Sequence, residues 1–305
     1  MLHKDHTHKH THGHNGDTAG KNLLIASVLN ITITVVELAG GILSNSFALL
    51  SDALHNFSDA VAVFLAYLSN KISKKPPTAL QTFGFKRIEI LAALINSIAM
   101  VAICIYLFFE AYHRLINPEP INGLLMIIIA GIGLMANLLA VSFLRHDKDK
   151  NLNVKAAYLH LMGDTLSSVA VVIGGIFIYI YHIWWLDPVL TFIIGIYILK
   201  ETVGILKQAY EILMQSTPTE IDINKIKQNL EKIEGVENIH HVHVWKLNDS
   251  QIHFECHLDL KNDIRISETD ELLSIVKASL KDQFSIEHTT IQFEYNCCDN
   301  KSMIY

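Results

Sequence analysis

Residues 47–68 read FALLSDALHNFSDAVAVFLAYL, and this stretch decides the class of fold. Its length and apolar content suit a helix that crosses a bilayer, which takes about 20 residues. It nevertheless carries Asp52, His55 and Asp59. Ionisable side chains are costly within a membrane, and where they occur they usually serve a function. The stretch therefore predicts a transmembrane helix that carries a functional site.

Further apolar runs of similar length lie on either side of this stretch. The chain has 305 residues, of which 50% are hydrophobic, and a mean hydropathy of +0.30. We predict six transmembrane helices, at residues 22–43, 47–68, 88–115, 124–144, 156–181 and 184–205. After Thr217 the sequence is mixed and charged, which is typical of a soluble domain with its own core. The expected organisation is a polar tail at 1–20, a six-helix transmembrane domain at 21–214 and a cytoplasmic α+β domain at 215–305.

Basic residues set the expected orientation of these helices. The loop after the second helix and the loop after the fourth are rich in lysine and arginine, at Lys71, Lys74, Lys75, Lys86, Arg87, Arg145, Lys148, Lys150 and Lys155. The loops after the first and fifth helices have none. Because positive loops stay in the cytoplasm, an even number of helices places both termini there. The polar N-terminus does not read as a cleavable signal peptide, and the net charge of −6 does not affect this assignment.

Two histidine–aspartate pairs form the expected intramembrane site. His55 and Asp59 are four residues apart, so they lie on one face of a helix, and His160 and Asp164 repeat this spacing in the fifth helix. One such residue alone could be a packing group, but a repeated pair favours a site. Two imidazoles and two carboxylates form a tetrahedral set that suits Zn²⁺, with Cd²⁺, Co²⁺ and Fe²⁺ as alternatives. Cu(I) would prefer sulfur ligands, and Mg²⁺ or Ca²⁺ would prefer oxygen alone.

Other polar residues in the apolar runs have less specific interpretations. Asp52 lies on the same helix face as His55, one turn nearer the membrane surface, and we interpret it as an entrance residue or a helix cap. Asn30, Glu37 and Asn137 are interpreted first as groups that form hydrogen bonds between helices, and second as part of the ion pathway.

Several motifs resemble one known family. SDALHNFSD at 51–59 and HLMGD at 160–164 are similar to the paired H-x-x-x-D motifs of the cation diffusion facilitator family, in its zinc branch. KPPTALQTFGFKRIEILAA at 75–93 resembles that family's loop into the third helix, and DPVLTFIIGIYI at 187–198 resembles its sixth helix. The resemblance covers nearly the whole chain.

This resemblance implies a homodimeric secondary transporter that exchanges a divalent cation for protons by alternating access. The transport site would consist of His55, Asp59, His160 and Asp164. The manganese branch has an acidic residue in place of the first histidine, so His55 argues against that branch. Some relatives bind a second zinc ion in the loop at 69–87, but here that loop has no histidine, aspartate or cysteine.

The N-terminal tail is rich in histidine, at His3, His6, His8, His10, His12 and His14. It has no apolar periodicity, so it is not expected to fold by itself. We interpret it as a flexible collector of cytosolic zinc. A solvated tail without a metal role and a purification tag are the alternatives, and the irregular spacing argues against a tag.

The cytoplasmic domain is expected to be helix, strand, strand, helix, strand. The first helix falls within 218–235 with Thr219 as its cap, and the second falls within 267–284 with Ser267 as its cap. The strands are expected at 240–247, 251–260 and 288–295. The pattern resembles the family's ferredoxin-like, metallochaperone-like domain, which dimerises and binds regulatory zinc.

The resemblance places the ligands of this regulatory zinc at His240, His257 and Glu294. His257 and Glu294 fall on polar strand faces, whereas His240 alternates with Val242 and Val244 and so has an awkward parity. Ordinary solvated histidines are the alternative. Cys297 and Cys298 follow the last strand and are either a thiolate clamp for metal or simply tail residues. The other two cysteines are Cys104 and Cys256, and no disulfide is expected in the cytoplasm.

The same residues are compatible with other functions. A membrane zinc sensor that binds the ion without moving it is the main alternative to an exporter. An intramembrane zinc hydrolase would need H-E-x-x-H, where the glutamate is a general base, but both pairs here end in aspartate. No organic cofactor and no nucleic acid partner are expected. The short loop at 145–155 lacks the histidine-rich insert of eukaryotic relatives and favours a bacterial inner-membrane protein.

Overall fold

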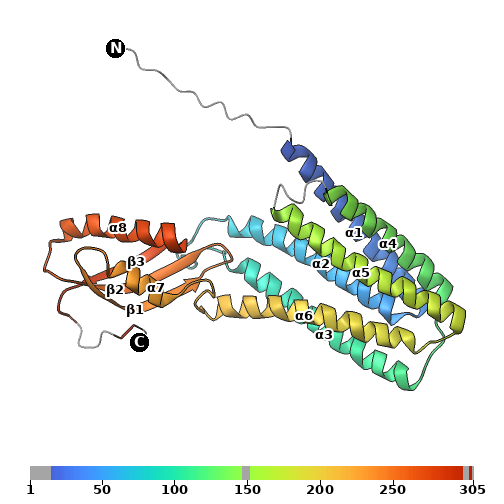
Figure 1. Ribbon diagram of the computed structural model, residues 1–305. Helices are drawn as coiled ribbons and strands as arrows, with labels where there is room; N and C mark the ends of the chain where they lie inside the picture. The colour runs from blue at the N-terminus through green and yellow to red at the C-terminus, as the bar shows by residue number, and fades with distance from the viewer. Residues whose placement is uncertain (1–14, 146–151, 298–301, 304–305) are drawn as a thin grey trace, which may run out of the picture. The chain divides into compact units, whose positions relative to one another are not determined.

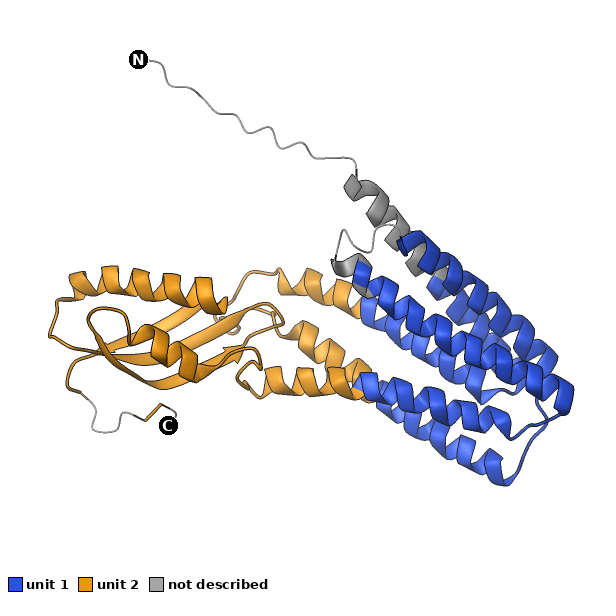
Figure 2. Cartoon of the chain, in the orientation of Figure 1, with its two compact units in different colours: residues 1–63, 99–202 blue, residues 64–98, 203–305 orange. Residues whose placement is uncertain are grey.

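The computed structural model describes residues 15–145, 152–297 and 302–303. Six long helices are followed by a small α+β region (Figure 1). The chain divides into two compact units, Met1–Val63 with Ala99–Thr202 and Phe64–Ile98 with Val203–Tyr305 (Figure 2). The second unit therefore includes the ends of three long helices as well as the α+β region. Each unit is described by itself.

The long helices have the lengths expected of membrane spans. They are α1 (Asn15–Ser44), α2 (Phe47–Ser73), α3 (Ile88–Ile116), α4 (Gly123–Arg145), α5 (Leu152–Tyr181) and α6 (Leu186–Leu213). In the described chain α3, α4, α6 and the 157–181 part of α5 are long and apolar enough to cross a membrane. The described apolar part of α1 is shorter, at Asn30–Ser44, and α2 carries the polar site residues. The expected helical membrane domain followed by an α+β domain is confirmed.

Apolar packing holds the helices of the first unit together. In this unit α4 packs against both α1 and α5. Its buried core contains Met100, Met126, Val171 and Ile198. Large apolar side chains also point outward from these helices, as a lipid-facing surface requires. Examples are Phe109, Leu166 and Ile193, all of which are exposed.

The α+β part of the second unit is a three-stranded sheet with two helices. Its elements are α7 (Ile223–Leu230), β1 (Val236–Lys246), β2 (Ile252–Leu260), α8 (Ile266–Phe284) and β3 (His288–Glu294). The strand order is β1-β2-β3, with β1 antiparallel and β3 parallel to β2. Ile226 and Leu230 of α7 and Val276 and Leu280 of α8 are buried in one core with Phe254, Cys256 and Leu258 of β2. The two helices therefore cover one face of the sheet.

Two expected helix caps are wrong. The N-cap of α7 is Asp222, whose carboxylate accepts a hydrogen bond from the backbone N of Asn224 at 2.9 Å. The expected cap, Thr219, instead lies within a turn in which the N–H of Ile221 donates to the carbonyl of Pro218. The N-cap of α8 is Arg265, because its N–H donates to the Glu268 carboxylate at 3.0 Å and leaves Ser267 inside the first turn.

Candidate metal sites

The structure brings the two histidine–aspartate pairs together between α2 and α5. His55 Nε2 lies 3.5 Å from Asp59 Oδ2 and 3.8 Å from Asp164 Oδ1. His160 Nε2 lies 3.1 Å from Asp59 Oδ2 and 3.6 Å from Asp164 Oδ2. Each histidine therefore contacts both aspartates, one on its own helix and one on the other helix.

These distances suit a small cation with four ligands. In a tetrahedron with ligands about 2.0 Å from Zn²⁺, neighbouring ligand atoms are about 3.3 Å apart. The four histidine–aspartate distances, from 3.1 to 3.8 Å, lie on both sides of that value. The two imidazole rings meet edge-on, with centroids 5.9 Å apart. Two neutral imidazoles and two carboxylates can thus surround one divalent ion.

The site is buried on one side and open on the other. The side chain of Asp164 is 3% exposed and that of His55 is 10% exposed. The side chains of His160 and Asp59 are 40% and 30% exposed. A site with an open side can release its ion, whereas a structural zinc site is normally closed.

Asp52 is buried inside the helix bundle, and its expected role as an entrance residue stays a prediction. It is 1% exposed, and its carboxylate accepts hydrogen bonds from the hydroxyls of Ser167 and, at 3.3 Å, Ser168 on α5. Burial follows from these partners, because two serines of α5 replace the water that would otherwise solvate the carboxylate. Asp52 is an interior residue next to the site.

Two α6 residues near the site were missed in the sequence. The hydroxyl of Tyr197 lies close to Gly163 of α5 and forms a hydrogen bond with Glu201. The charge of Glu201 acts on His160. The periodicity of α6 gave no signal for these residues, because it does not show which face of the helix approaches α5.

A second set of possible ligands lies on the sheet of the second unit. Glu294 Oε2 is 3.2 Å from His240 Nε2, and its Oε1 is 2.7 Å from His257 Nδ1. These three residues form the one group of three metal-ligating side chains found with all ligand atoms within 4.8 Å of one another in the described residues. His240 Nδ1 is buried without a hydrogen-bond partner there, and His240 Nε2 faces Glu294 Oε2. The donor set therefore fits one zinc ion.

A β-bulge explains how His240 reaches this set despite its parity. The register between β1 and β2 shifts between His240 and His243, and His241 in the bulge has a φ of 51°. The shift leaves His240 directly opposite His257, while Val242 and Val244 still face the core. The ring of His241 stacks on His257 with centroids 4.6 Å apart.

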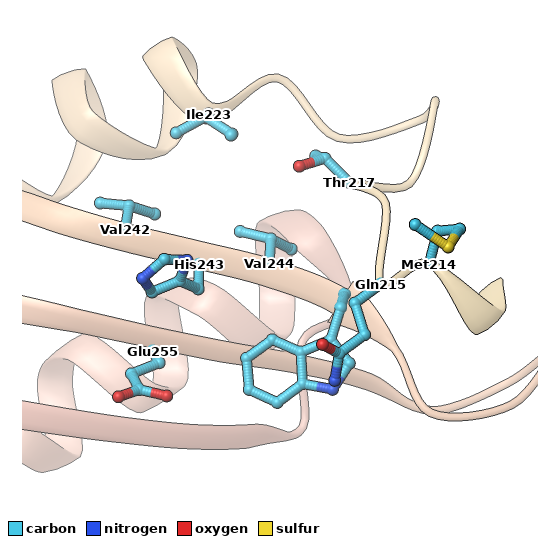
Figure 3. A pocket seen from close by; sticks show the side chains of 9 residues that line it. Met214, Gln215, Thr217, Ile223, Val242, His243, Val244 and Glu255 are labelled. Atoms are coloured by element: carbon cyan, nitrogen blue, oxygen red, sulfur yellow. The ribbon is translucent and has the colours of Figure 1, made fainter. Parts of the chain in front are cut away.

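A separate pocket of about 560 Å³ lies beside β1 (Figure 3). Val242 and Val244 point toward Ile223 of α7, whereas His243 and Glu255 lie on the opposite side of β1. The pocket is lined by Met214, Gln215, Thr217, Ile223, Val242, His243, Val244, Trp245 and Glu255. None of the three ligands of the sheet site lines it, so it is distinct from that site.

The remaining candidates are placed as follows. His3, His6, His8, His10, His12, His14 and Cys298 lie outside the described residues. Cys297 is exposed after β3, and Cys104 and Cys256 are buried free cysteines. Burial raises the pKa of the Cys256 thiol to about 12, so it stays protonated at neutral pH.

Comparisons with known proteins identify the family of both parts of the chain. Residues 23–214 match the family described as "Cation efflux transmembrane domain", and residues 218–296 match "Cation efflux protein, cytoplasmic domain". The zinc transporter ZitB of Escherichia coli (strain K12) is 38% identical over 96% of this chain and 93% of its own length. The "Cadmium, cobalt and zinc/H(+)-K(+) antiporter" of Bacillus subtilis (strain 168) is 36% identical over 93% of this chain and 91% of its own length.

Solved structures are also similar to part of the chain. The metal-bound C-terminal domain of the CzcD transporter of Cupriavidus metallidurans is 31% identical, covers 24% of this chain and 99% of that chain, and has a TM-score of 0.22. The two family matches together extend over nearly the whole chain. The chain is therefore a member of the cation diffusion facilitator family, a multi-pass metal-cation efflux transporter and not an enzyme.

Proposed function

We propose that the chain exports Zn²⁺ from the cytoplasm in exchange for protons, by alternating access around His55, Asp59, His160 and Asp164. The observation that carries this proposal is the contact of each histidine with both aspartates, at 3.1 to 3.8 Å, between two membrane helices. A structural pair would need only one partner, whereas this arrangement gives one ion four ligands.

Proton exchange follows from the chemistry of these ligands. Zn²⁺ binds neutral imidazole and ionised carboxylate, so protonation of the site and metal binding exclude each other. Imidazole titrates near neutral pH, which places this competition in the physiological range. The inward-open carrier binds Zn²⁺ from the cytoplasm, and protons taken up from the outer side favour its release there. The protonated carrier then returns to the inward-open state.

The ligand types also support a preference among metals. Two nitrogen and two oxygen donors favour Zn²⁺, with Cd²⁺ and Co²⁺ as further substrates of similar charge and ligand preference. The names of similar proteins include zinc, cadmium and cobalt. Fe²⁺ has a lower place in the affinity order of divalent metals.

The same proposal covers assembly and location. We place the chain in the bacterial inner membrane as a homodimer, with both termini in the cytoplasm. The basic loops after the second and fourth helices support this orientation. A regulatory zinc ion would be held by His240, His257 and Glu294. When bound, the ion would neutralise the negative charge of Glu294 between the strands. The histidine-rich tail would collect metal near the cytoplasmic mouth.

The test is zinc and proton flux in proteoliposomes that contain the purified full-length chain. Wild type should move Zn²⁺ faster under an inward-directed proton gradient, and His55→Ala or Asp164→Ala should lower the rate at least tenfold. The matched control is His113→Ala, because His113 is exposed near the end of α3, far along the chain from the site residues. Full transport by His55→Ala would contradict the assigned site. Zinc binding by wild type without flux would instead make the chain a membrane zinc sensor.

A further inference from the structure

Glu37 of α1 is a buried carboxylate outside the transport site. It is 0% exposed. Its Oε2 accepts a hydrogen bond from Asn56 Nδ2 at 3.1 Å, whereas its Oε1 is buried without a hydrogen-bond partner in the described part of the chain. Asn56 follows His55 on α2, so Glu37 lies one hydrogen bond away from the neighbour of a proposed metal ligand.

A line of polar groups continues from Glu37 through the first unit. On α2, Asn56 is one turn from Asp52, which bonds to Ser168 of α5. The hydroxyl of Ser168 in turn accepts a hydrogen bond from Asn137 Nδ2 of α4 at 3.3 Å. The oxygen atoms Ser51 Oγ, Asn56 Oδ1 and Asn137 Oδ1 are also buried without a hydrogen-bond partner among the described residues. Buried acceptors without donors are uncommon in folded proteins.

Among the described residues, the charges that act on Glu37 are negative. They belong to Asp52 on α2 and Asp164 on α5. The other titratable residues of α1, Asp17 and Lys21, lie at least four helical turns before Glu37, and the only one on α4 is Arg145 at its end. No ion pair with lysine or arginine is found for Glu37 within the described residues. The buried Arg114 pairs with Glu110 and Glu119 instead. An ionised carboxylate in this position is costly unless a cation or a proton neutralises it.

The space around Glu37 favours a proton over a metal ion. Its Oε1 fills a notch in α4 at Gly133, where an added Cβ would lie only 1.9 Å from that oxygen. Sodium and potassium ions need several oxygen ligands arranged around them, and the helix backbone at Gly133 occupies one side of Oε1. A proton needs no such space.

We propose that Glu37 carries a counter-transported proton, separately from the four metal ligands. In the zinc-loaded carrier the positive ion offsets the charges of Asp164 and Asp52, and Glu37 can stay ionised. When Zn²⁺ leaves on the outer side, Glu37 binds a proton from that side. The proton is released to the cytoplasm after the carrier returns. The inference rests on the proposed zinc–proton exchange, and it names Glu37 as a residue that couples proton uptake to zinc release.

The experiment compares Glu37→Gln with wild type as full-length chains in proteoliposomes, with zinc flux and proton flux measured together. Glutamine keeps the shape of the side chain and cannot ionise. We expect Glu37→Gln to bind Zn²⁺ within about threefold of the wild-type affinity, to move fewer protons per zinc ion, and to lose the acceleration by a proton gradient. Glu110→Gln is the matched control, because Glu110 contacts Arg114 near the C-terminal end of α3. This variant should keep the wild-type number of protons per zinc ion.

A second measurement tests the inference even if Glu37→Gln does not fold. Isotope-edited infrared difference spectra of the native chain should show a protonated glutamate carboxyl group on zinc release, and Glu37→Asp should lack this glutamate band. A persistent band in Glu37→Asp, or an unchanged proton-to-zinc ratio in Glu37→Gln, would overturn the inference. Dependence of native flux on Na⁺ or K⁺ that Glu37→Gln removes would also overturn it. Zinc flux by wild type without proton counterflux would instead refute the proposed exchange itself.

Discussion

Asp187 Oδ1 lies 2.5 Å from the hydroxyl of Ser46, and through this contact the start of α6 caps the start of α2. The same carboxylate accepts hydrogen bonds from the backbone N–H groups of Phe47 and Ala48 at 2.9 and 3.2 Å. A carboxylate at a helix N-terminus satisfies free N–H groups and interacts favourably with the helix dipole. Asp187 thus fixes the end of the helix that carries His55 and Asp59.

Asp187→Ala should therefore destabilise the membrane domain. The substitution leaves the donors at Ser46, Phe47 and Ala48 without this acceptor, and we expect a loss of about 2 kcal/mol or more. Asp187→Asn keeps one oxygen acceptor and should lose less. The measurement is the free energy of unfolding of the detergent-solubilised chain in a denaturant titration. Asp263→Ala, at an exposed position, is the control, and an equal loss in both alanine variants would refute the capping role.

Asp59 should be required for transport but not for folding. Its Oδ2 is the nearest carboxylate oxygen to His160 Nε2, at 3.1 Å, and its side chain is 30% exposed. Asp59→Asn removes one of the two negative charges of the site, so the zinc transport rate should fall at least tenfold. The far-ultraviolet circular dichroism and melting temperature should stay near those of wild type. Asp249→Asn, in an exposed turn, should transport normally, and transport at the wild-type rate by Asp59→Asn would remove it from the ligand set.

Zinc should stabilise the sheet of the C-terminal α+β part through Glu294. A ligand at a hundred times its dissociation constant stabilises the folded state by about 2.7 kcal/mol. In the full-length chain, zinc should slow hydrogen exchange in β1 and β3, and Glu294→Gln should abolish this protection because the carboxylate joins His240 and His257.

His243→Ala provides the control for the sheet site. His243 lies on the same strand, is exposed and is outside the group of three ligands, so it should keep the zinc-dependent protection. Protection that persists in Glu294→Gln would show that zinc binds elsewhere on the chain.

Much of the fold follows from local patterns in the sequence. The apolar runs predicted the long helices because a membrane span needs length and apolarity, which are both local properties. The i, i+4 spacing placed His55 with Asp59 and His160 with Asp164, since a helix turn fixes that relation. Helix ends were less predictable, as at Asp222, because a cap depends on the turn that precedes it.

The contacts between elements could not be read from periodicity. The bulge at His241 changes the register of β1 and puts His240 opposite His257, and strand alternation alone does not show a bulge. The serines of α5 that bury Asp52 cannot be identified from its position on α2. Glu201 of α6 was missed for the same reason: its effect on His160 depends on how α6 packs against α5.

His253 should make the stability of the second unit depend on pH. Its ring is buried, stacks on Trp245 with centroids 5.4 Å apart, and lies 4.1 Å from the ring of His288. Burial, with the positive charges of His288, Lys86 and Arg87, lowers the pKa of His253 below its ordinary value of 6.5. As the pH falls through about 6.5, the unfolded chain takes up a proton that the folded chain resists, so the free energy of unfolding decreases.

His253→Phe isolates this contribution, because phenylalanine keeps an aromatic ring between its neighbours and cannot titrate. The measurement is hydrogen exchange of the β2 amides in the full-length chain at pH about 7.5 and about 5.5, corrected for intrinsic rates. Wild type should lose protection at the lower pH, and His253→Phe should lose less of it. His243→Phe makes the same change at an exposed position and should behave as wild type does. If His253→Phe and wild type lose protection equally, the titration of His253 does not control the stability of this sheet.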